Sequence, residues 1–349
     1  MKITSLKAIY PRYRHVPPSW RTHMWQIVVQ VETDAGVFGF GSGGGGVPAV
    51  EIVNRHMAEI AVGSTVDSPA DIAEIWDRLY FASLPYGRKG VAIMALSGVD
   101  LALWDALGRA EARPVRDLIG GPRVDSVPVY ATGGDSHWYA ELGITGQKAP
   151  HRWTGEESDY DRAVEQVVGV RNALGPDAEV MIDTYMTWTS DVTLEMAKRL
   201  RELNVRWFED VLTPDDLAGQ AKLRGKVGST LIAGGEHEFT HHGFREIARA
   251  GALDVWQPDI TWCGGISVGL RILDLASETG VPVVPHRGGE PWGLHFIAGS
   301  GCHQLAEMVM GDRDGPTDVV WLDAPEPADG RLQLTDEPGF GVRLNEAVL

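Results

Sequence analysis

Acidic residues recur at nearly even intervals through the middle of the chain, each at the end of a short apolar run. The runs read MID, WFE, IAGGE and WQPD, and a fifth run, VVPH, ends in a histidine. The successive gaps are 26, 27, 23 and 27 residues, about the length of one strand plus one helix. This period predicts a (β/α)8 barrel, in which the strand ends meet at the face that carries the chemistry. The five residues are Asp183, Glu209, Glu236, Asp259 and His286.

These five side chains predict two functional groups at one barrel mouth. Three carboxylates there would repel one another unless a hard divalent cation held them. We therefore expect Asp183, Glu209 and Glu236 to bind a metal ion. The nearby Asp259 is expected to orient and polarise His286.

Composition narrows the class of protein. The 349 residues are 44% hydrophobic and 23% charged, which is typical of a soluble globular protein with a large core. A net charge of −17 argues against nucleic acid and anionic membranes as partners. Two cysteines cannot build a disulfide framework, and we expect no apolar run of membrane length. The first residues, MKITSLKAIYPRYRHV, lack the apolar centre of a signal peptide, so we expect a cytoplasmic protein.

The pattern changes along the chain and predicts two domains. Residues 1–122 contain hairpin strands, a turn at 34–36 and an amphipathic helix around 92–110, which predicts an α+β capping domain. Residues 123–321 alternate strand and helix and form the predicted barrel domain with the catalytic mouth. The strand-like, turn-rich tail 322–349 is expected to pack back on the first domain. The predicted barrel strands are VPVYA, GITGQKA, EVMID, VRWFED, STLIAGG, LDVWQPD and VPVVPH, with HQLAEMV as the candidate eighth.

Two other motifs suggest different chemistry. The run GFGSGGGG at 39–46 resembles a phosphate-cradling loop, but its strand belongs to a hairpin rather than to a βαβ unit. We therefore interpret it as a flexible loop, for which a lid over the barrel mouth is one role. The segment GEHEF followed by His241 and His242 suggests a zinc site, but two adjacent histidines cannot both point inward.

Over nearly its whole length the chain resembles the enolase superfamily, in the mandelate racemase-like branch. The resemblance lies in VETDAGVFGFG, LSGVDLALWDALGR, QPDITWCGG, VVPH and the three strand-end acids. Within that branch the chain is most similar to L-rhamnonate dehydratase-like sugar-acid dehydratases, through YATGG, GITGQKAPHRW and the ending APEPADGRLQLTDEPGFGVRLN. The resemblance implies Mg²⁺ on Asp183, Glu209 and Glu236, with His286 as the base and Asp259 as its partner.

One departure from the family pattern bears on the reaction. Many relatives carry Lys-x-Lys on the second barrel strand, and the second lysine is a base on the opposite face of the substrate. Here the positions are Lys148 and Pro150, and proline has no proton to exchange. Lys148 is similar to the first family lysine, which would neutralise the substrate carboxylate. A one-base site favours dehydration, with an epimerase or cycloisomerase of the same superfamily as the alternative.

The expected reaction is the dehydration of an acid sugar, such as L-rhamnonate or a related aldonate, to a 2-keto-3-deoxy acid. His286 removes the C2 proton, an enediolate forms, and the β-hydroxyl leaves as water. The proton for that hydroxyl could come from His286 or from another residue near the mouth. As a separate expectation, the protein forms a homo-oligomer. The candidate substrate contacts are His295, Glu307, His151, Arg21 and His23, of which the first three are the alternative proton donors.

Overall fold

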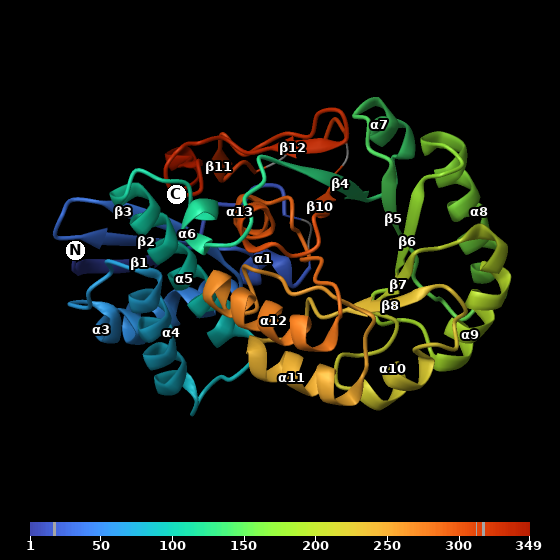
Figure 1. The fold of residues 1–349 in the computed structure, drawn as a ribbon, viewed down its shortest axis with the longest axis horizontal. Coiled ribbons are helices and arrows are strands. Elements are labelled where there is room, and N and C mark those ends of the chain that lie inside the picture. Colours follow the sequence, from blue (N-terminus) through green and yellow to red (C-terminus); the bar gives the residue numbers. More distant parts are fainter. Residues whose placement is uncertain (17–18, 312, 316–317) are drawn as a thin grey trace.

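The computed structural model describes residues 1–16, 19–311, 313–315 and 318–349. A capping part built largely from the first 120 residues lies beside a curled sheet surrounded by helices (Figure 1). The capping sheet is antiparallel, in the order β1 (Ile3–Ile9), β2 (Ile27–Thr33) and β3 (Phe38–Gly43). Its helices are α1 (Arg21–Met24), α2 (Gly46–Ile52), α3 (Ala58–Ala61), α4 (Pro69–Ser83), α5 (Val91–Ala110) and α6 (Val115–Ile119), with a π-helical turn at Val53–Met57 between α2 and α3.

The glycine run forms part of a strand, so its interpretation as a flexible loop is wrong. Alternate glycines of β3 lie against the backbone of α5. A Cβ on Gly39 would lie 2.2 Å from the Ala102 carbonyl oxygen, and one on Gly41 would lie 2.3 Å from the Gly98 carbonyl oxygen. Because no side chain fits there, the glycines allow close packing of strand on helix.

Helix α5 is buried in the core and joins the two parts of the molecule. It is apolar and long enough to cross a membrane, contrary to the sequence expectation. However, 89% of its apolar 18-residue stretch is buried inside the protein. Its Ser97 Oγ accepts a hydrogen bond from the Gly264 N–H at 2.9 Å, and its Asp100 carboxylate accepts one from the Ser267 N–H at 3.1 Å. Both donors belong to the start of α12 (Gly265–Thr279), so α5 caps a helix of the barrel.

The barrel strands are parallel and follow one another in sequence order. β10 pairs with β4, and the sheet then runs through β5, β6, β7 and β8 to β9. The strands are β4 (Ser126–Thr132), β5 (Gly146–Pro150), β6 (Glu179–Asp183), β7 (Trp207–Glu209), β8 (Leu231–Gly234), β9 (Val255–Trp256) and β10 (Ala306–Val309). The helices of this part are α7 (Ser136–Glu141), α8 (Ser158–Leu174), α9 (Ser190–Arg199), α10 (Leu217–Leu223), α11 (Thr240–Ala250), α12 and α13 (Pro291–Ser300).

The expected seventh strand, VPVVPH, is reduced to two parallel bridges. Val283 pairs with Trp256, and His286 pairs with Asp259. Pro282 and Pro285 lack the N–H groups that a continuous ladder needs, so the segment closes the gap between β9 and β10 without forming a regular strand. The bridge to Asp259 nevertheless fixes His286 beside it.

The tail contacts the barrel as well as the capping part. β12 (Arg331–Gln333) pairs antiparallel with β4, as the neighbouring green and red strands show in Figure 1. β11 (Trp321–Leu322) and β13 (Arg343–Leu344) pair with each other. The Phe340 N–H donates to Asp105 of α5 at 2.9 Å, so the tail also lies against the capping part.

Candidate active site

Carboxylates from three consecutive barrel strands gather at the carboxyl end of the sheet. Asp183 ends β6, Glu209 ends β7, and Glu236 follows β8 by two residues. Asp183 and Glu209 are buried, whereas the Glu236 side chain is 15% exposed. The Glu209 Oε2 atom accepts hydrogen bonds from Gln257 Nε2 at 2.6 Å and from Trp207 Nε1 at 3.1 Å, so its position is fixed from two sides.

Lys148 lies among these acids on β5. Its Nζ atom donates to Glu209 Oε1 and lies 2.7 Å from Glu307 Oε1 and 3.6 Å from Asp183 Oδ2. Burial would lower the pKa of Lys148, but the three carboxylates raise it well above its usual range. The buried ammonium therefore stays charged, in the place expected for neutralising negative charge on a substrate.

Excess negative charge remains in this cluster despite Lys148. Burial raises the pKa of Glu209 to about 7, against the effect of Lys148, and burial together with Glu236 raises the pKa of Asp183. Burial would lower the pKa of His286, but Glu236, Glu307 and Asp259 raise it to about 10. Besides burial, neighbouring carboxylates contribute to all three shifts, Glu236 and Glu307 among them. Oxygen donors in this state suit a hard divalent cation such as Mg²⁺.

A histidine–aspartate pair faces the acids. The His286 Nδ1 atom lies 2.8 Å from Asp259 Oδ2, and its Nε2 atom lies 3.4 Å from Glu236 Oε2. Burial would raise the pKa of Asp259, but Arg287 and His286 hold it well below the usual range. An ionised Asp259 directs the Nδ1–H of the ring, which leaves Nε2 facing the acids. A cation bound to those acids would offset the negative charge that raises the pKa of His286, and would favour the neutral ring that can accept a proton at Nε2.

Members of both groups, among them Asp183, Glu236 and His286, line one cavity of about 370 Å³ between the capping part and the barrel. Aromatic rings from both parts form its apolar walls, and Arg21 and Arg152 add positive charge. Arg21 lies over the rings of Trp20 and Trp25, and Arg152 lies 4.4 Å from the ring centre of Tyr185. The lining residues are Trp20, Arg21, Trp25, Thr132, Lys148, Arg152, Asp183, Tyr185, Met186, Glu236, His237, Trp262, His286, Arg287, Glu307 and Val309.

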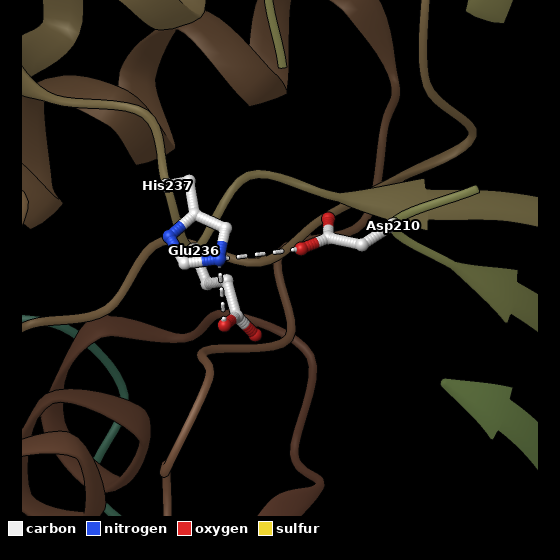
Figure 2. A group of neighbouring side chains, drawn as sticks. All are labelled: Asp210, Glu236 and His237. Carbon is white, nitrogen blue, oxygen red and sulfur yellow. Dashed lines mark ion pairs between the residues drawn. The ribbon is translucent and has the colours of Figure 1, made fainter. Parts of the chain in front are cut away.

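A second acidic grouping shares Glu236. The His237 Nε2 atom lies 3.4 Å from Glu236 Oε1 and 3.8 Å from Asp210 Oδ2, as Figure 2 shows. Burial, and then Glu236, raises the pKa of Asp210 well above its usual range. The three ligand atoms lie within 4.8 Å of one another. Glu236 therefore stands between this group and the Asp183–Glu209 pair, which extends the acidic side of the cavity.

Comparison with known proteins agrees with this geometry. Residues 18–120 match the family described as "Mandelate racemase / muconate lactonizing enzyme, N-terminal domain", and residues 137–348 match "Enolase C-terminal domain-like". This chain belongs to the enolase superfamily. An L-rhamnonate dehydratase of Saccharopolyspora erythraea is 37% identical over 98% of this chain and 89% of its own length.

Solved structures of the enolase superfamily share the whole fold. L-rhamnonate dehydratase of Gibberella zeae, in a crystal structure with Mg, has a TM-score of 0.90 and 30% identity, covering 99% of this chain and 95% of its own. The 3,6-anhydro-D-galactonate cycloisomerase of Zobellia galactanivorans has a TM-score of 0.86 and 25% identity, covering 99% and 98%. The expected architecture of capping part and barrel is thus confirmed for this member of the superfamily.

Three of the candidate substrate contacts do not lie at the cavity. His295 is buried in α13, where its Nδ1 accepts from the Arg116 N–H at 3.2 Å, and burial lowers its pKa to about 3. His151 is buried with Nε2 on the Asp159 carbonyl at 2.9 Å and Nδ1 on Trp188 Nε1 at 3.3 Å. His23 is exposed and is not among the lining residues. These three expectations were wrong for this cavity, because spacing along the chain does not encode where a side chain of a helix or loop points.

The other two candidates, Arg21 and Glu307, do line the cavity of this superfamily member. Glu307, in β10, accepts from Lys148, from the Thr132 hydroxyl and from the Arg287 N–H. Burial would raise the pKa of Glu307, but Lys148 and His286 lower it to about 2. Sequence reasoning missed Thr132, Arg152, Tyr185 and Gln257. Thr132 and Gln257 follow strand-like runs at the same sheet edge, which is the signal that could have found them.

Proposed function

We propose that this protein is a magnesium-dependent sugar-acid dehydratase, a hydro-lyase that acts on an aldonate such as L-rhamnonate or a related acid sugar. The observation that carries the proposal is a single histidine–aspartate base facing a buried lysine and an acid cluster across one cavity. The similarity to L-rhamnonate dehydratases over the full length supports the same reaction class.

Asp183, Glu209 and Glu236 would hold magnesium. Burial and neighbouring carboxylates raise the pKa of Asp183 and of Glu209, so a cation among these acids would stabilise their ionised forms. When bound, it supplies positive charge where the carboxylate of the substrate becomes more negative. Lys148 adds a second positive charge at the same place, since its Nζ atom lies among these acids. Together these groups favour the enediolate over the substrate ground state.

His286 removes the proton at C2 through Nε2, while Asp259 holds Nδ1–H. The electron pair of the broken C–H bond moves into the carboxylate and forms the enediolate. The C3 hydroxyl then leaves with the electron pair of its C–O bond, and it departs as water after accepting a proton. The resulting enol takes a proton at C3 and becomes the 2-keto-3-deoxy acid.

Three observations support one proton donor for the departing hydroxyl. His295 and His151 are buried away from the cavity, with their ring nitrogens engaged elsewhere. Glu307 carries no proton near neutral pH, because its pKa is lowered to about 2. The protonated His286 is therefore our proposed donor, which requires the proton and the hydroxyl to leave from the same face of the substrate.

The competing proposal is an isomerase, since a cycloisomerase of the superfamily shares the fold. A two-base isomerase needs a second proton acceptor opposite His286. Pro150 pairs with Asp183 at the position where relatives carry that lysine, and it offers no such group. We therefore favour elimination.

A panel of acid sugars separates these reactions. Incubation with Mg²⁺ and semicarbazide detection of 2-keto acids should identify a substrate that is dehydrated, and chelation of the metal should stop the reaction. The His286→Asn variant should fold and bind metal but lose both dehydration and C2-proton exchange in D2O. A change in optical rotation without keto acid would instead establish an isomerase, and turnover in chelated wild-type enzyme would refute the metal assignment.

A further inference from the structure

Arg287, the residue after the proposed base, is buried and turned back toward the base pair. Its side chain is 6% exposed, and its backbone has φ of 51°, a conformation that an L-residue adopts only at a cost in free energy. Gly288 and Gly289 follow directly and would tolerate such a backbone without that cost. A strained backbone at a buried arginine indicates that contacts of its side chain offset the cost in free energy.

The guanidinium of Arg287 binds Asp259, the carboxylate that orients His286. Its Nε donates to Asp259 Oδ2 at 2.9 Å, and a terminal nitrogen lies 2.8 Å from the same oxygen. That terminal nitrogen also donates to the Thr261 hydroxyl at 2.6 Å, and the hydroxyl in turn donates to Asp259 Oδ1 at 2.7 Å. Both carboxylate oxygens are therefore fixed by donors other than the imidazole.

The same side chain reaches the capping part. Its other terminal nitrogen donates to Glu290 Oε1 at 3.3 Å, and Glu290 accepts from Gln26 Nε2, also at 3.3 Å. Gln26 immediately precedes β2, and the ring of Trp25 lies 5.8 Å from the guanidinium carbon. The backbone N–H of Arg287 donates to Glu307 at 2.9 Å, which ties it to β10.

We propose that Arg287 is a positioning residue: it holds Asp259, and through Asp259 it holds the His286 imidazole in line with the C2 proton, while Glu290 and Gln26 connect this alignment to the docking of the capping part. The inference rests on the proposed role of His286 as base. Lysine cannot replace arginine here, because a single ammonium cannot span Asp259, Thr261 and Glu290 in one plane.

The test compares Arg287→Lys and Arg287→Ala with wild-type enzyme. Arg287→Lys should lower kcat about 10²-fold, the loss expected from a small misplacement of a reacting group, with KM little changed. Dilute guanidinium chloride should restore part of the kcat of Arg287→Ala, because the free cation fills the vacated position. A crystal structure of Arg287→Lys should show the His286 ring displaced from its hydrogen bond with Asp259.

Arg109→Ala is the matched control. Arg109 also pairs with a buried aspartate, Asp105, at 2.6 Å and lies over an aromatic ring, but it belongs to the capping part. This variant should lose thermal stability and keep kcat. An Arg287→Lys enzyme with wild-type kcat, or with an unmoved His286 ring, would overturn the proposal, as would the absence of rescue by guanidinium. Should the wild-type protein dehydrate no acid sugar, the proposed function fails, yet the position of the ring still decides this inference.

Discussion

Replacement of Lys148 by methionine tests the charge arrangement at the centre of the site. The ammonium is 1% exposed and lies among Glu209, Glu307 and Asp183, so methionine would leave buried carboxylates without their cation. Removal of one partner from a buried ion pair typically costs about 3–5 kcal/mol. A chain of this length has an unfolding entropy of about 0.7 kcal/mol per kelvin, so the metal-free variant should unfold about 4–7 °C below wild type.

The same variant should bind Mg²⁺ more tightly than wild type. A positive charge beside the acids disfavours a second cation, and relief of about 1.4 kcal/mol of repulsion corresponds to a tenfold gain in affinity. Titration calorimetry measures this affinity without substrate, and differential scanning calorimetry measures the unfolding temperature. Catalysis should nevertheless fall strongly in kcat and kcat/KM, because the ammonium acts on the enediolate. Equal unfolding temperatures together with equal Mg²⁺ affinities would refute the reasoning.

Three further predictions concern the reaction face, the packing of the capping part and one buried acid. Because Pro150 offers no second base, deuterium from D2O should enter C2 only from the His286 face, and NMR detection of exchange into the C2 epimer would contradict one-base chemistry. Gly41→Ala should destabilise the fold by about 1–3 kcal/mol or more, because its Cβ would meet the backbone of α5. Gly169→Ala, whose Cβ would have no atom within 4 Å, should stabilise α8 by up to about 1 kcal/mol. Urea unfolding of both variants measures these changes. Burial raises the pKa of Asp100 to about 7, so its contribution to stability is present below about pH 4 and lost as pH rises through 7. Asp100→Asn should abolish this pH-dependent loss of unfolding free energy, which amounts to at most about 4 kcal/mol. Unfolding temperatures that fall equally from pH 5 to pH 8 in variant and wild type would contradict the prediction.

The spacing of strand-end residues predicted the barrel and the acid cluster, because consecutive parallel strands bring their carboxyl ends to one edge. Asp259 and His286 were predicted for the same reason, and they do lie together. Regular pairing of the seventh strand was not predictable from apolarity, since its prolines decide which N–H groups exist. His295 and His151 lie on chain segments that leave the sheet edge, and packing against α6 or Trp188 determines where they point.

The glycine run of β3 illustrates a second limit. Glycine at 39, 41 and 43 permits both a flexible loop and the closest approach of a strand to a helix, and only the partner helix distinguishes them. The role of Arg287 was equally hidden, because two of its three acceptors, Asp259 and Thr261, precede it by 28 and 26 residues in the chain.

The capping of α12 by α5 has a consequence for how such enzymes can be recombined. Ser97 and Asp100 supply acceptors to backbone donors at 264 and 267, and Trp104 donates to the Ser267 hydroxyl at 3.2 Å. A capping part transplanted from another enzyme would therefore have to bring matching acceptors, or leave the first turn of α12 without partners just five residues beyond Asp259. The unit that can be exchanged between relatives is thus the capping part together with the α12 start, so new substrate preferences would be grafted more safely through residues of the cavity wall than through the whole domain.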